Sequence, residues 1–468
     1  MRFLAVMVAL LAPLTAGVPV TLRVATYNAS LNRNTQGQLA TDLNTTLNAQ
    51  ARQVAEIIQR VRPDVLVINE FDVDPANPAL ARERFHDYYL RIPHNLQAAI
   101  TYPHRYSAIS NTGVHSGLDL DNSGAITTTQ GTDAFGNDCY GFGWFPGQYS
   151  FVVFSKYPIL TGQARSFQYF KWKDMPGNVM PPGYYSADEQ AVFRLSSKSH
   201  MDLPIEVKPG QVFHLLVSHP TPPSFDGAED RNGRRNHDEI RLWAEYLNNA
   251  TWLYDDAGIF GGLQNAASER FIILGDLNAD PLDGDSYPGA INQLRNHPLV
   301  NSSANPSSPG GTQQSALQGG INNTHTGNPA FDTADFAAAG NLRVDHVLPG
   351  RTGFTITGSG VFWPLNNDPT FPLISASDHR LVWLDLTMTP ILAQSVRAIA
   401  IARHGADIVL TWGAQDGVTY KVEWTSDYTT WQDTPAIPVI LVAGTATATD
   451  PAPAENHRAY RVVVTLEQ

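Results

Sequence analysis

Cysteine is almost absent from this chain of 468 residues, in which Cys139 is the only one. A single thiol excludes an internal disulfide, so the fold must be held by its apolar core, by bound ions, or by both. Hydrophobic residues make up 43% of the chain, which is enough for a sizeable core, and the length predicts one large domain or two.

Basic residues are also scarce, because 31 Lys and Arg face 44 Asp and Glu and leave a formal charge of −13. This balance argues against a protein that coats nucleic acid without sequence preference, since such proteins are usually basic. It does not exclude a nuclease, because only the cleft of a nuclease must attract phosphate and bound metal ions add positive charge there.

Apolar runs long enough to span a bilayer are missing. The first residues show one Arg, an apolar stretch from Phe3 to Leu14, and then small residues up to Gly17. This pattern predicts a signal peptide over residues 1–17 and a secreted or periplasmic protein. The stretch is shorter than the roughly 20 apolar residues that a span requires, so we expect no transmembrane segment in the mature chain.

Short apolar runs recur through most of the chain and predict strands. They lie at residues 21–30, 64–72, 149–159, 212–220, 270–278, 343–350 and 378–386. Helical spacing of Val54, Ile57, Ile58 and Val61 predicts a helix that ends before Pro63, and a second helix is expected over 236–250. Continuous apolar runs indicate strands covered on both faces, which favours two packed sheets flanked by helices over a simple doubly wound fold.

The character of the sequence changes near residue 389. Beyond it, short alternating runs such as "ADIVLTW" and "TYKVEWT" are separated by Gly, Asp and Pro turns. We therefore expect a larger domain over 18–389 and a small β-sandwich of fibronectin or related type over 390–468. The second domain has no cluster of ligand-type residues, so we interpret it as an accessory module, for example for surface attachment.

Polar residues able to bind a metal or move a proton stand at the ends of the predicted strands. They are Asn28, Glu70, His219, Asp276, Asn278, Asp345, Asp378 and His379. Singly, each has an ordinary structural explanation, such as the Asx-turns that Asp276 and Asn278 can form. Together, they are the ingredients of one metal-dependent hydrolytic site.

Six motifs in order carry a family resemblance. They are "YN" (27–28), "INE" (68–70), "SHPTPP" (218–223), "GDLN" (275–278), "RVDHVLP" (343–349) and "SDHR" (377–380). This set resembles the endonuclease/exonuclease/phosphatase superfamily over roughly residues 20–387. The resemblance implies a four-layer α/β sandwich with two central mixed β-sheets, and the hydrolysis of phosphate esters.

The chemistry of phosphate esters explains these residue types. A divalent cation offsets the charge that develops on phosphate, and it takes hard oxygen ligands. Glu70 is the strongest ligand candidate, and Asn28 and Asp378 would complete or support the site. Mg²⁺ is the expected ion, with Mn²⁺ and Ca²⁺ as alternatives. Asp276 would orient or deprotonate the attacking water, and Asn278 would donate to a phosphate oxygen. The implied mechanism is in-line attack of water without a covalent enzyme intermediate.

Two histidines complete the predicted site. The family pairs the histidine found here as His379 with the aspartate found here as Asp345, and such a pair fixes the tautomer of the imidazole and raises its pKa. This imidazolium would bind the scissile phosphate or move a proton. We assign His219 to protonation of the leaving group or to stabilisation of the phosphate.

Three arginines precede the second predicted helix, and their role stays open. Arg231, Arg234 and Arg235 could form a basic clamp for a phosphate-bearing substrate. They could equally pair with Asp230, Asp238 and Glu239 at a solvated helix start, where ion pairs contribute little.

The sequence thus predicts an exported, metal-dependent phosphoesterase whose substrate is a nucleic acid, a phospholipid or a small phosphate ester. The alternative is a non-catalytic surface binding or adhesion protein that retains the fold. Loss of the metal ligand or of the histidine pair would favour that alternative. In this sequence, the metal ligand and the histidine pair are both present.

Overall fold

The computed structural model describes residues 20–388, 400–413, 418–427, 430–442, 445–451 and 458–466. The predicted signal peptide, residues 1–17, lies outside these ranges. The described chain divides into two compact units: residues 21–205 with 213–387, and the residues from 388 onward with Val20 and 206–212. No helix in these ranges is long and apolar enough to cross a membrane.

The first sheet of the larger unit has six strands in the order β12-β13-β1-β2-β4-β3. Their bounds are β1 Val20–Leu31, β2 Val65–Phe71, β3 His104–Ser107, β4 Phe151–Ser155, β12 Phe354–Val361 and β13 Val382–Met388. β1 and β2 are parallel, whereas β2 and β4 are antiparallel, so the sheet is mixed.

The second sheet has five strands in the order β11-β8-β7-β6-β5. Their bounds are β5 Arg165–Ser166, β6 His200–Lys208, β7 Gln211–Ser218, β8 Phe271–Asp276 and β11 Asp345–Pro349. This sheet is also mixed, because β7 and β8 are parallel and β8 and β11 are antiparallel. A separate ribbon joins β9 Ala334–Phe336 to β10 Gly340–Leu342.

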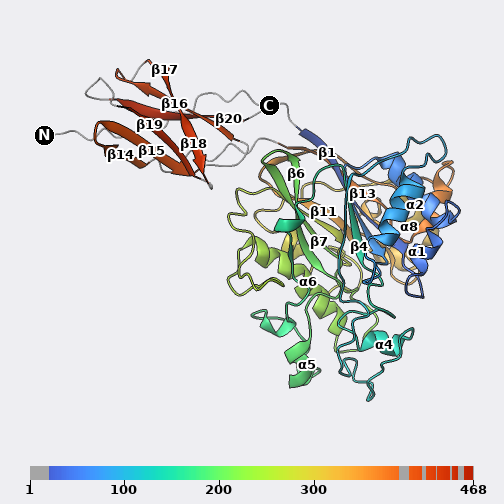
Figure 1. Ribbon diagram of the computed structural model, residues 1–468. Coiled ribbons are helices and arrows are strands. Elements are labelled where there is room, and N and C mark those ends of the chain that lie inside the picture. Colours follow the sequence, from blue (N-terminus) through green and yellow to red (C-terminus); the bar gives the residue numbers. More distant parts are fainter. Residues whose placement is uncertain are drawn as a thin grey trace. The chain divides into compact units, whose positions relative to one another are not determined.

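Helices cover the outer face of each sheet (Figure 1). The α-helices are α1 Gln38–Asp42, α2 Ala49–Val61, α3 Leu80–Phe85, α4 Asp133–Asn137, α5 Ala187–Val192, α6 Arg231–Leu247, α7 Asn292–Arg295 and α8 Pro309–Gln318. The short helices of other types are η1 His86–Leu90, a π-helix, and the 3₁₀ helices η2 Thr161–Gln163, η3 Trp172–Asp174, η4 Gly320–Thr324, η5 Pro329–Phe331 and η6 Phe371–Ala376. α1, α2, α3 and η6 share a core with the first sheet, and α6 and α7 share one with the second. The layers therefore run helices, sheet, sheet, helices, as predicted.

The two predicted helices differ in how well their boundaries were predicted. α2 begins after Asn48, whose side chain accepts from the Ala51 N–H at 3.0 Å, and it ends before Pro63 as expected. α6 begins at Arg231, five residues earlier than residue 236. Asp226 explains the earlier start, because its carboxylate accepts from the Asn232 N–H in the first turn at 2.6 Å.

Strand alternation places the polar strand ends between the two sheets. Ala25, Tyr27 and Ala29 of β1 and Phe271 and Ile273 of β8 belong to the helix-facing cores. Since successive side chains of a strand point to opposite faces, Asn28 and Asp276 face the space between the sheets. Their side chains meet there, because Asn28 Nδ2 donates to Asp276 Oδ2 at 3.0 Å.

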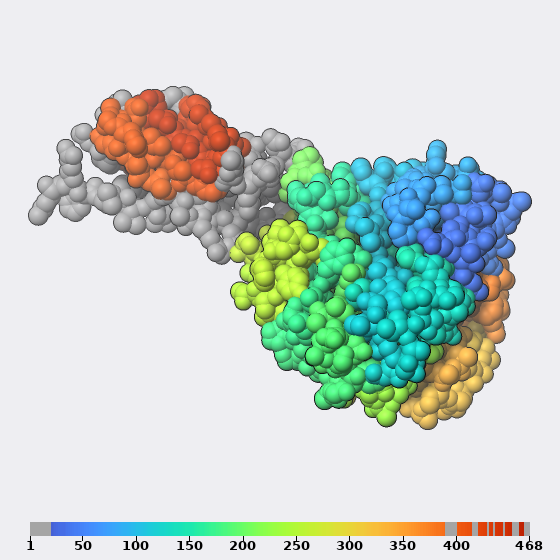
Figure 2. Space-filling model, turned by 60° about the horizontal axis from the view of Figure 1, so that its bottom comes forward, coloured from blue at the N-terminus to red at the C-terminus, as the bar shows by residue number. Residues whose placement is uncertain are grey.

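Two long connections extend beyond the ends of the sheets. One joins β3 to β4 and carries α4, and the other joins β5 to β6 and carries α5 (Figure 1). Figure 2 shows the face that they form, with cyan and green segments side by side. Asn111 joins the two connections: its Nδ2 donates to Gln168 O at 2.8 Å and to Ser196 O at 2.7 Å.

The described part of the C-terminal unit is all-β, as predicted, and contains a four-stranded sheet, β14-β15-β19-β18, and a three-stranded sheet, β17-β16-β20. Their bounds are β14 Ala400–His404, β15 Asp407–Gly413, β16 Val418–Thr425, β17 Gln432–Ile437, β18 Val439–Val442, β19 Thr445–Asp450 and β20 Ala459–Leu466. One apolar core takes Leu410, Trp412 and Ala446 from the first sheet and Val422 and Trp424 from the second. The two sheets therefore form a sandwich.

Candidate active site

Glu70 reaches the site because its backbone is left-handed. Its neighbour Asn69 faces the space between the sheets, so regular alternation would turn Glu70 toward the helices. A φ of 54° at Glu70 breaks that alternation. The half-buried carboxylate then accepts from Asn28 Nδ2 at 3.0 Å through one oxygen and from Asn32 Nδ2 at 2.8 Å through the other.

Asp276, the last residue of β8, lies at the centre of the site. Its Oδ2 is 3.0 Å from Asn28 Nδ2, 3.4 Å from His219 Nε2 and 3.7 Å from His379 Nε2. Its Oδ1 accepts from the Asn278 N–H at 2.9 Å. Burial alone would raise the pKa of Asp276, but the two histidines and Asn28 lower it well below its ordinary value. The residue is therefore a carboxylate throughout the neutral range.

His379 is held by a second carboxylate. Its Nδ1 lies 2.9 Å from Asp345 Oδ2, which also accepts from Thr333 Oγ1 at 2.8 Å. Burial would lower the pKa of His379, but Asp345 and Asp276 raise it to about 10. Burial raises the pKa of Asp345 to about 6, against the opposing charge of the imidazolium. His379 is therefore an imidazolium at neutral pH.

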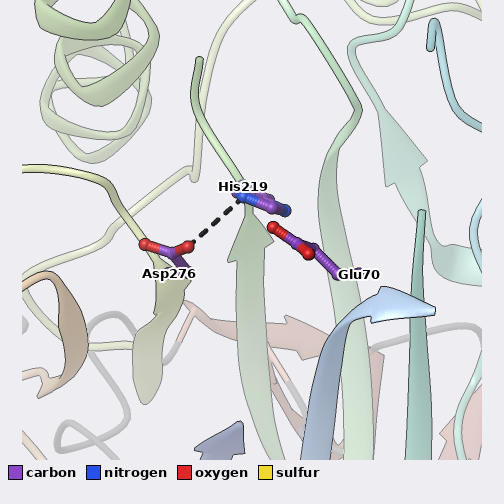
Figure 3. A group of neighbouring side chains, drawn as sticks. All are labelled: Glu70, His219 and Asp276. Carbon is purple, nitrogen blue, oxygen red and sulfur yellow. Dashed lines mark ion pairs between the residues drawn. The ribbon is translucent and has the colours of Figure 1, made fainter. Parts of the chain in front are cut away.

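His219, unlike His379, is uncharged. Its pKa is lowered by burial and by the positive charge of Lys198, although Asp276 opposes both. The imidazole is therefore neutral at pH 7. Its Nε2 faces Asp276, and its buried Nδ1 has no hydrogen-bond partner among the described residues. Figure 3 shows His219, Asp276 and Glu70 with their side chains directed toward one another.

Two overlapping groups of side chains could hold a metal ion. The ligand atoms of Glu70, His219 and Asp276 lie within 4.8 Å of one another, and so do those of Asp276, Asp345 and His379. Glu70 and Asp276 offer carboxylate oxygens, the ligand type that Mg²⁺, Mn²⁺ and Ca²⁺ take. Asp345 Oδ1 adds a buried carboxylate oxygen with no hydrogen-bond partner among the described residues. The donor set thus fits a hard divalent cation.

A third acidic group lies in the β3–β4 connection and consists of Asp119, Asp121 and Asp138. Its carboxylates already order their own loop. Asp138 accepts from the N–H groups of Leu120 at 3.0 Å and Thr127 at 2.7 Å.

The other two predicted metal ligands occupy different positions. Asn28 donates through one amide nitrogen to both Glu70 and Asp276, so in this arrangement it fixes the separation of the two carboxylates. Asp378 is exposed and accepts from Ser30 Oγ at 3.3 Å. Asp378 is absent from both groups of close ligand atoms within the described ranges.

Asn278 also lies at the site, with a left-handed φ of 50°. Its backbone N–H donates to Asp276, and its side-chain Nδ2 donates to the carbonyl of Pro220 at 3.0 Å. Because Pro220 follows His219 directly, Asn278 joins the ends of β7 and β8.

Arg235 is buried in the protein and is not exposed at the start of a helix. The side chain is buried, and its guanidinium donates to the carbonyls of Leu195 and Arg194, each at 2.9 Å, and to that of Tyr140. These acceptors belong to the connections that lead into β4 and β6.

Arg231 and Arg234 also bond to neighbouring residues of the chain. Arg231 pairs with Glu229, and Arg234 donates to the carbonyls of Glu229 at 3.1 Å and Val179 at 3.2 Å. The three arginines therefore contact Glu229 and backbone carbonyls, and their guanidinium groups also lie over the rings of Tyr184, Tyr287 and Phe193. Binding of substrate by these arginines stays a prediction.

Asn69 is a site residue that sequence reasoning did not single out. Its Oδ1 accepts from Thr26 Oγ1 at 3.2 Å and from the Asp276 N–H at 3.3 Å, so it joins the two sheets beneath the site. Its position in "INE", at a strand end beside Glu70, was the available signal. Lys198, whose charge lowers the pKa of His219, was also not singled out, because "SSKSH" (196–200) has the composition of an ordinary loop.

A shallow, open hollow of about 480 Å³ adjoins Asp378. Its lining includes Ser377, Asp378 and Arg380 together with the apolar side chains of Phe371 and Ile374. Exposed Asp378 thus borders a space that a small group can enter.

The model of the Endonuclease/Exonuclease/phosphatase family matches residues 25–379. The chain therefore belongs to this family, which includes phosphodiesterases, nucleases and phosphatases. Its members are generally phosphoester hydrolases that use divalent metals. No protein with a curated description matches the chain.

Several solved structures are similar to this one. An endonuclease/exonuclease/phosphatase from Beutenbergia cavernae is 16% identical, with a TM-score of 0.43 and coverage of 95% of this chain and 96% of its own. Sphingomyelinase C from Streptomyces griseocarneus is 14% identical, with a TM-score of 0.39 and coverage of 78% and 99%. The human Nocturnin catalytic domain, with bound sulfate, is 13% identical, with a TM-score of 0.39 and coverage of 79% and 95%.

Proposed function

We propose that this protein is an exported, metal-dependent phosphodiesterase that hydrolyses its substrate by in-line attack of water. One observation carries the proposal: the buried carboxylate of Asp276 lies between a charged histidine, His379, and a neutral one, His219. Acid–base chemistry at phosphorus requires one group that can donate a proton and one that can accept a proton. The charged His379 and the neutral His219 are in these two states.

Glu70 and Asp276 would hold the divalent cation, with Mg²⁺ expected and Mn²⁺ or Ca²⁺ as alternatives. When bound, the cation would offset the negative charge that develops on the phosphate oxygens. Asn28 and Asn32 support this role because their amides fix both oxygens of Glu70. The exposed Asp378 would act at the rim, where it borders the hollow.

The remaining side chains would position the substrate and move protons. The lowered pKa of Asp276 keeps its carboxylate ready to orient a water molecule. The imidazolium of His379 would donate to a non-bridging phosphate oxygen, and the amide of Asn278 would donate to another. His219, which is neutral, would accept the proton that the attacking water loses, and the imidazolium so formed would return it to the leaving-group oxygen. Asp345 would act through His379 by keeping it protonated.

Export and substrate class rest on the sequence. The apolar stretch after Arg2 supports secretion or transfer to the periplasm. The substrate is a phosphate ester of a nucleic acid, a phospholipid or a small molecule, and the C-terminal sandwich would serve for surface attachment.

The test is hydrolysis of bis-p-nitrophenyl phosphate by the purified full chain. We expect release of p-nitrophenol that EDTA abolishes and that added Mg²⁺ or Mn²⁺ restores. A parallel panel of plasmid DNA, RNA, sphingomyelin, phosphatidylinositol and inositol phosphates would identify the substrate. No metal-dependent release from any of these compounds would contradict the proposal and favour a binding protein that retains the fold.

A further inference from the structure

Lys198 is a buried lysine whose amine forms no ion pair in the described part of the chain. The residue lies just before β6 and is only 7% exposed. Its Nζ donates to the carbonyl of Pro220 at 3.3 Å. Within the described ranges, no carboxylate oxygen lies within 4.0 Å of this ammonium.

This arrangement is costly for a structural lysine. An ammonium has three N–H donors, and a buried charge is unfavourable unless it is paired and fully hydrogen-bonded. One neutral carbonyl at 3.3 Å satisfies a single donor. The backbone at this position has its own role, because the Lys198 carbonyl accepts from the Asn111 N–H at 2.9 Å, and any residue type could supply that carbonyl. The buried carboxylate of Glu239 is the largest opposing charge, but it forms no ion pair with the amine, so the described part of the fold leaves the donors of Lys198 incompletely satisfied.

The ammonium of Lys198 lies next to the candidate metal site. Pro220 O accepts both from Lys198 Nζ and from Asn278 Nδ2, at 3.3 and 3.0 Å, so the two donors converge on one oxygen. Pro220 directly follows His219. Burial lowers the pKa of Lys198, and the carboxylate of Glu239 opposes this most, followed by those of Glu70 and Asp276. Lys198 therefore lies at the edge of the candidate metal site, on the same side as the amide of Asn278.

We propose that Lys198 is a substrate-binding residue whose ammonium contacts an anionic oxygen of the phosphate group. The proposal rests on the function proposed above. The site then has two sides: Glu70 and Asp276 hold the cation, and Lys198, Asn278 and His379 donate to the phosphate. A phosphate oxygen would give the ammonium the charged partner that the protein itself does not provide, since charge-assisted hydrogen bonds are the strong ones.

The test is binding of inorganic phosphate to the full chain, measured by calorimetry with and without Mg²⁺. Lys198→Met keeps the length of the side chain and removes the charge. We expect its dissociation constant for phosphate to rise about tenfold to a hundredfold, with a melting temperature equal to or above that of the wild type. Lys198→Arg, which keeps the charge, should retain more of the affinity. Lys173→Met is the matched control, because Lys173 is exposed, and it should bind phosphate like the wild type.

Three outcomes would overturn the proposal: unchanged phosphate affinity in Lys198→Met, no phosphate binding by the wild type, or a Lys198→Met chain that does not fold, since the fold would then need the charge. Because the readout is binding, it separates this proposal from the hydrolytic one. Loss of phosphate affinity in a chain without esterase activity would support the role of Lys198 and reject the reaction.

Discussion

The molecule contains two pairs of packed sheets that use the space between them differently. In the C-terminal sandwich, that space is filled by apolar side chains such as Leu410, Trp412 and Trp424. In the larger unit, the strand ends bring Asn28 and Asp276 into the same kind of space. Strand alternation determines which side chains point inward in both cases, so the difference lies in residue type rather than in architecture.

The comparison teaches how a buried polar cluster is stabilised. A carboxylate between sheets would be strongly unfavourable without partners. Asp276 has several: the amide of Asn28, the backbone N–H of Asn278, and two histidines. Asn69 accepts from the Asp276 N–H and so joins the second sheet to the first beneath them. The site is therefore part of the contact between the two sheets.

The largest effect should come from Glu70→Gln, which removes a charged ligand and keeps the shape. We expect kcat on a phosphodiester to fall about a thousandfold or more, because the cation contributes several kcal/mol to the transition state. Steady-state kinetics would measure this. Asp119→Asn, in the acidic group of the β3–β4 connection, is the control and should keep its kcat. Full activity in Glu70→Gln would remove Glu70 from the site.

A smaller loss is expected for Asp345→Asn. The amide cannot hold His379 as an imidazolium, so the donor to phosphate weakens and kcat should fall by about a hundredfold. Thermal unfolding would show whether the variant is folded. A folded variant with the wild-type kcat would mean that the pair of His379 and Asp345 is only structural.

Trp412→Ala tests the apolar side of the comparison. Truncation of a buried tryptophan should destabilise the C-terminal sandwich by about 3–5 kcal/mol. The kcat of the catalytic unit should stay within about twofold of the wild type. Chemical unfolding and kinetics on the same preparation would check both. A large fall in kcat would show that the two units do not act separately.

The smallest effect concerns the pH dependence of stability. His200 is buried, its pKa is lowered by burial to about 4, and its Nε2 lies 2.8 Å from the carbonyl of Glu239. In the unfolded chain, His200 binds a proton near pH 6.5, whereas in the folded chain it does so only near pH 4. The free energy of unfolding therefore keeps its full contribution from His200 above pH 6.5 and loses it as pH falls toward 4. The loss is about 3 kcal/mol. In His200→Gln, the free energy of unfolding from urea titrations should fall less over this range, and an unchanged pH dependence would contradict the pKa.

Much of the fold was predictable from sequence, because strands covered on both faces read as continuous apolar runs. The run that ends at Asp276 became β8, and the run that contains Asn28 became β1. The direction of Glu70 was not predictable, since it depends on a left-handed backbone inside a strand. The burial of Arg235 and Lys198 was also hidden, because their partners, Leu195 and Pro220, come from other segments of the chain.

The central claim is that side chains from the ends of β2 and β8 hold a divalent cation at the polar end of the space between the sheets. The most direct measurement is anomalous diffraction from crystals of the full chain soaked in Mn²⁺. The account predicts a manganese peak at coordination distance from the carboxylates of Glu70 and Asp276. A peak only at the acidic group of Asp119, Asp121 and Asp138, or no bound manganese, would contradict it.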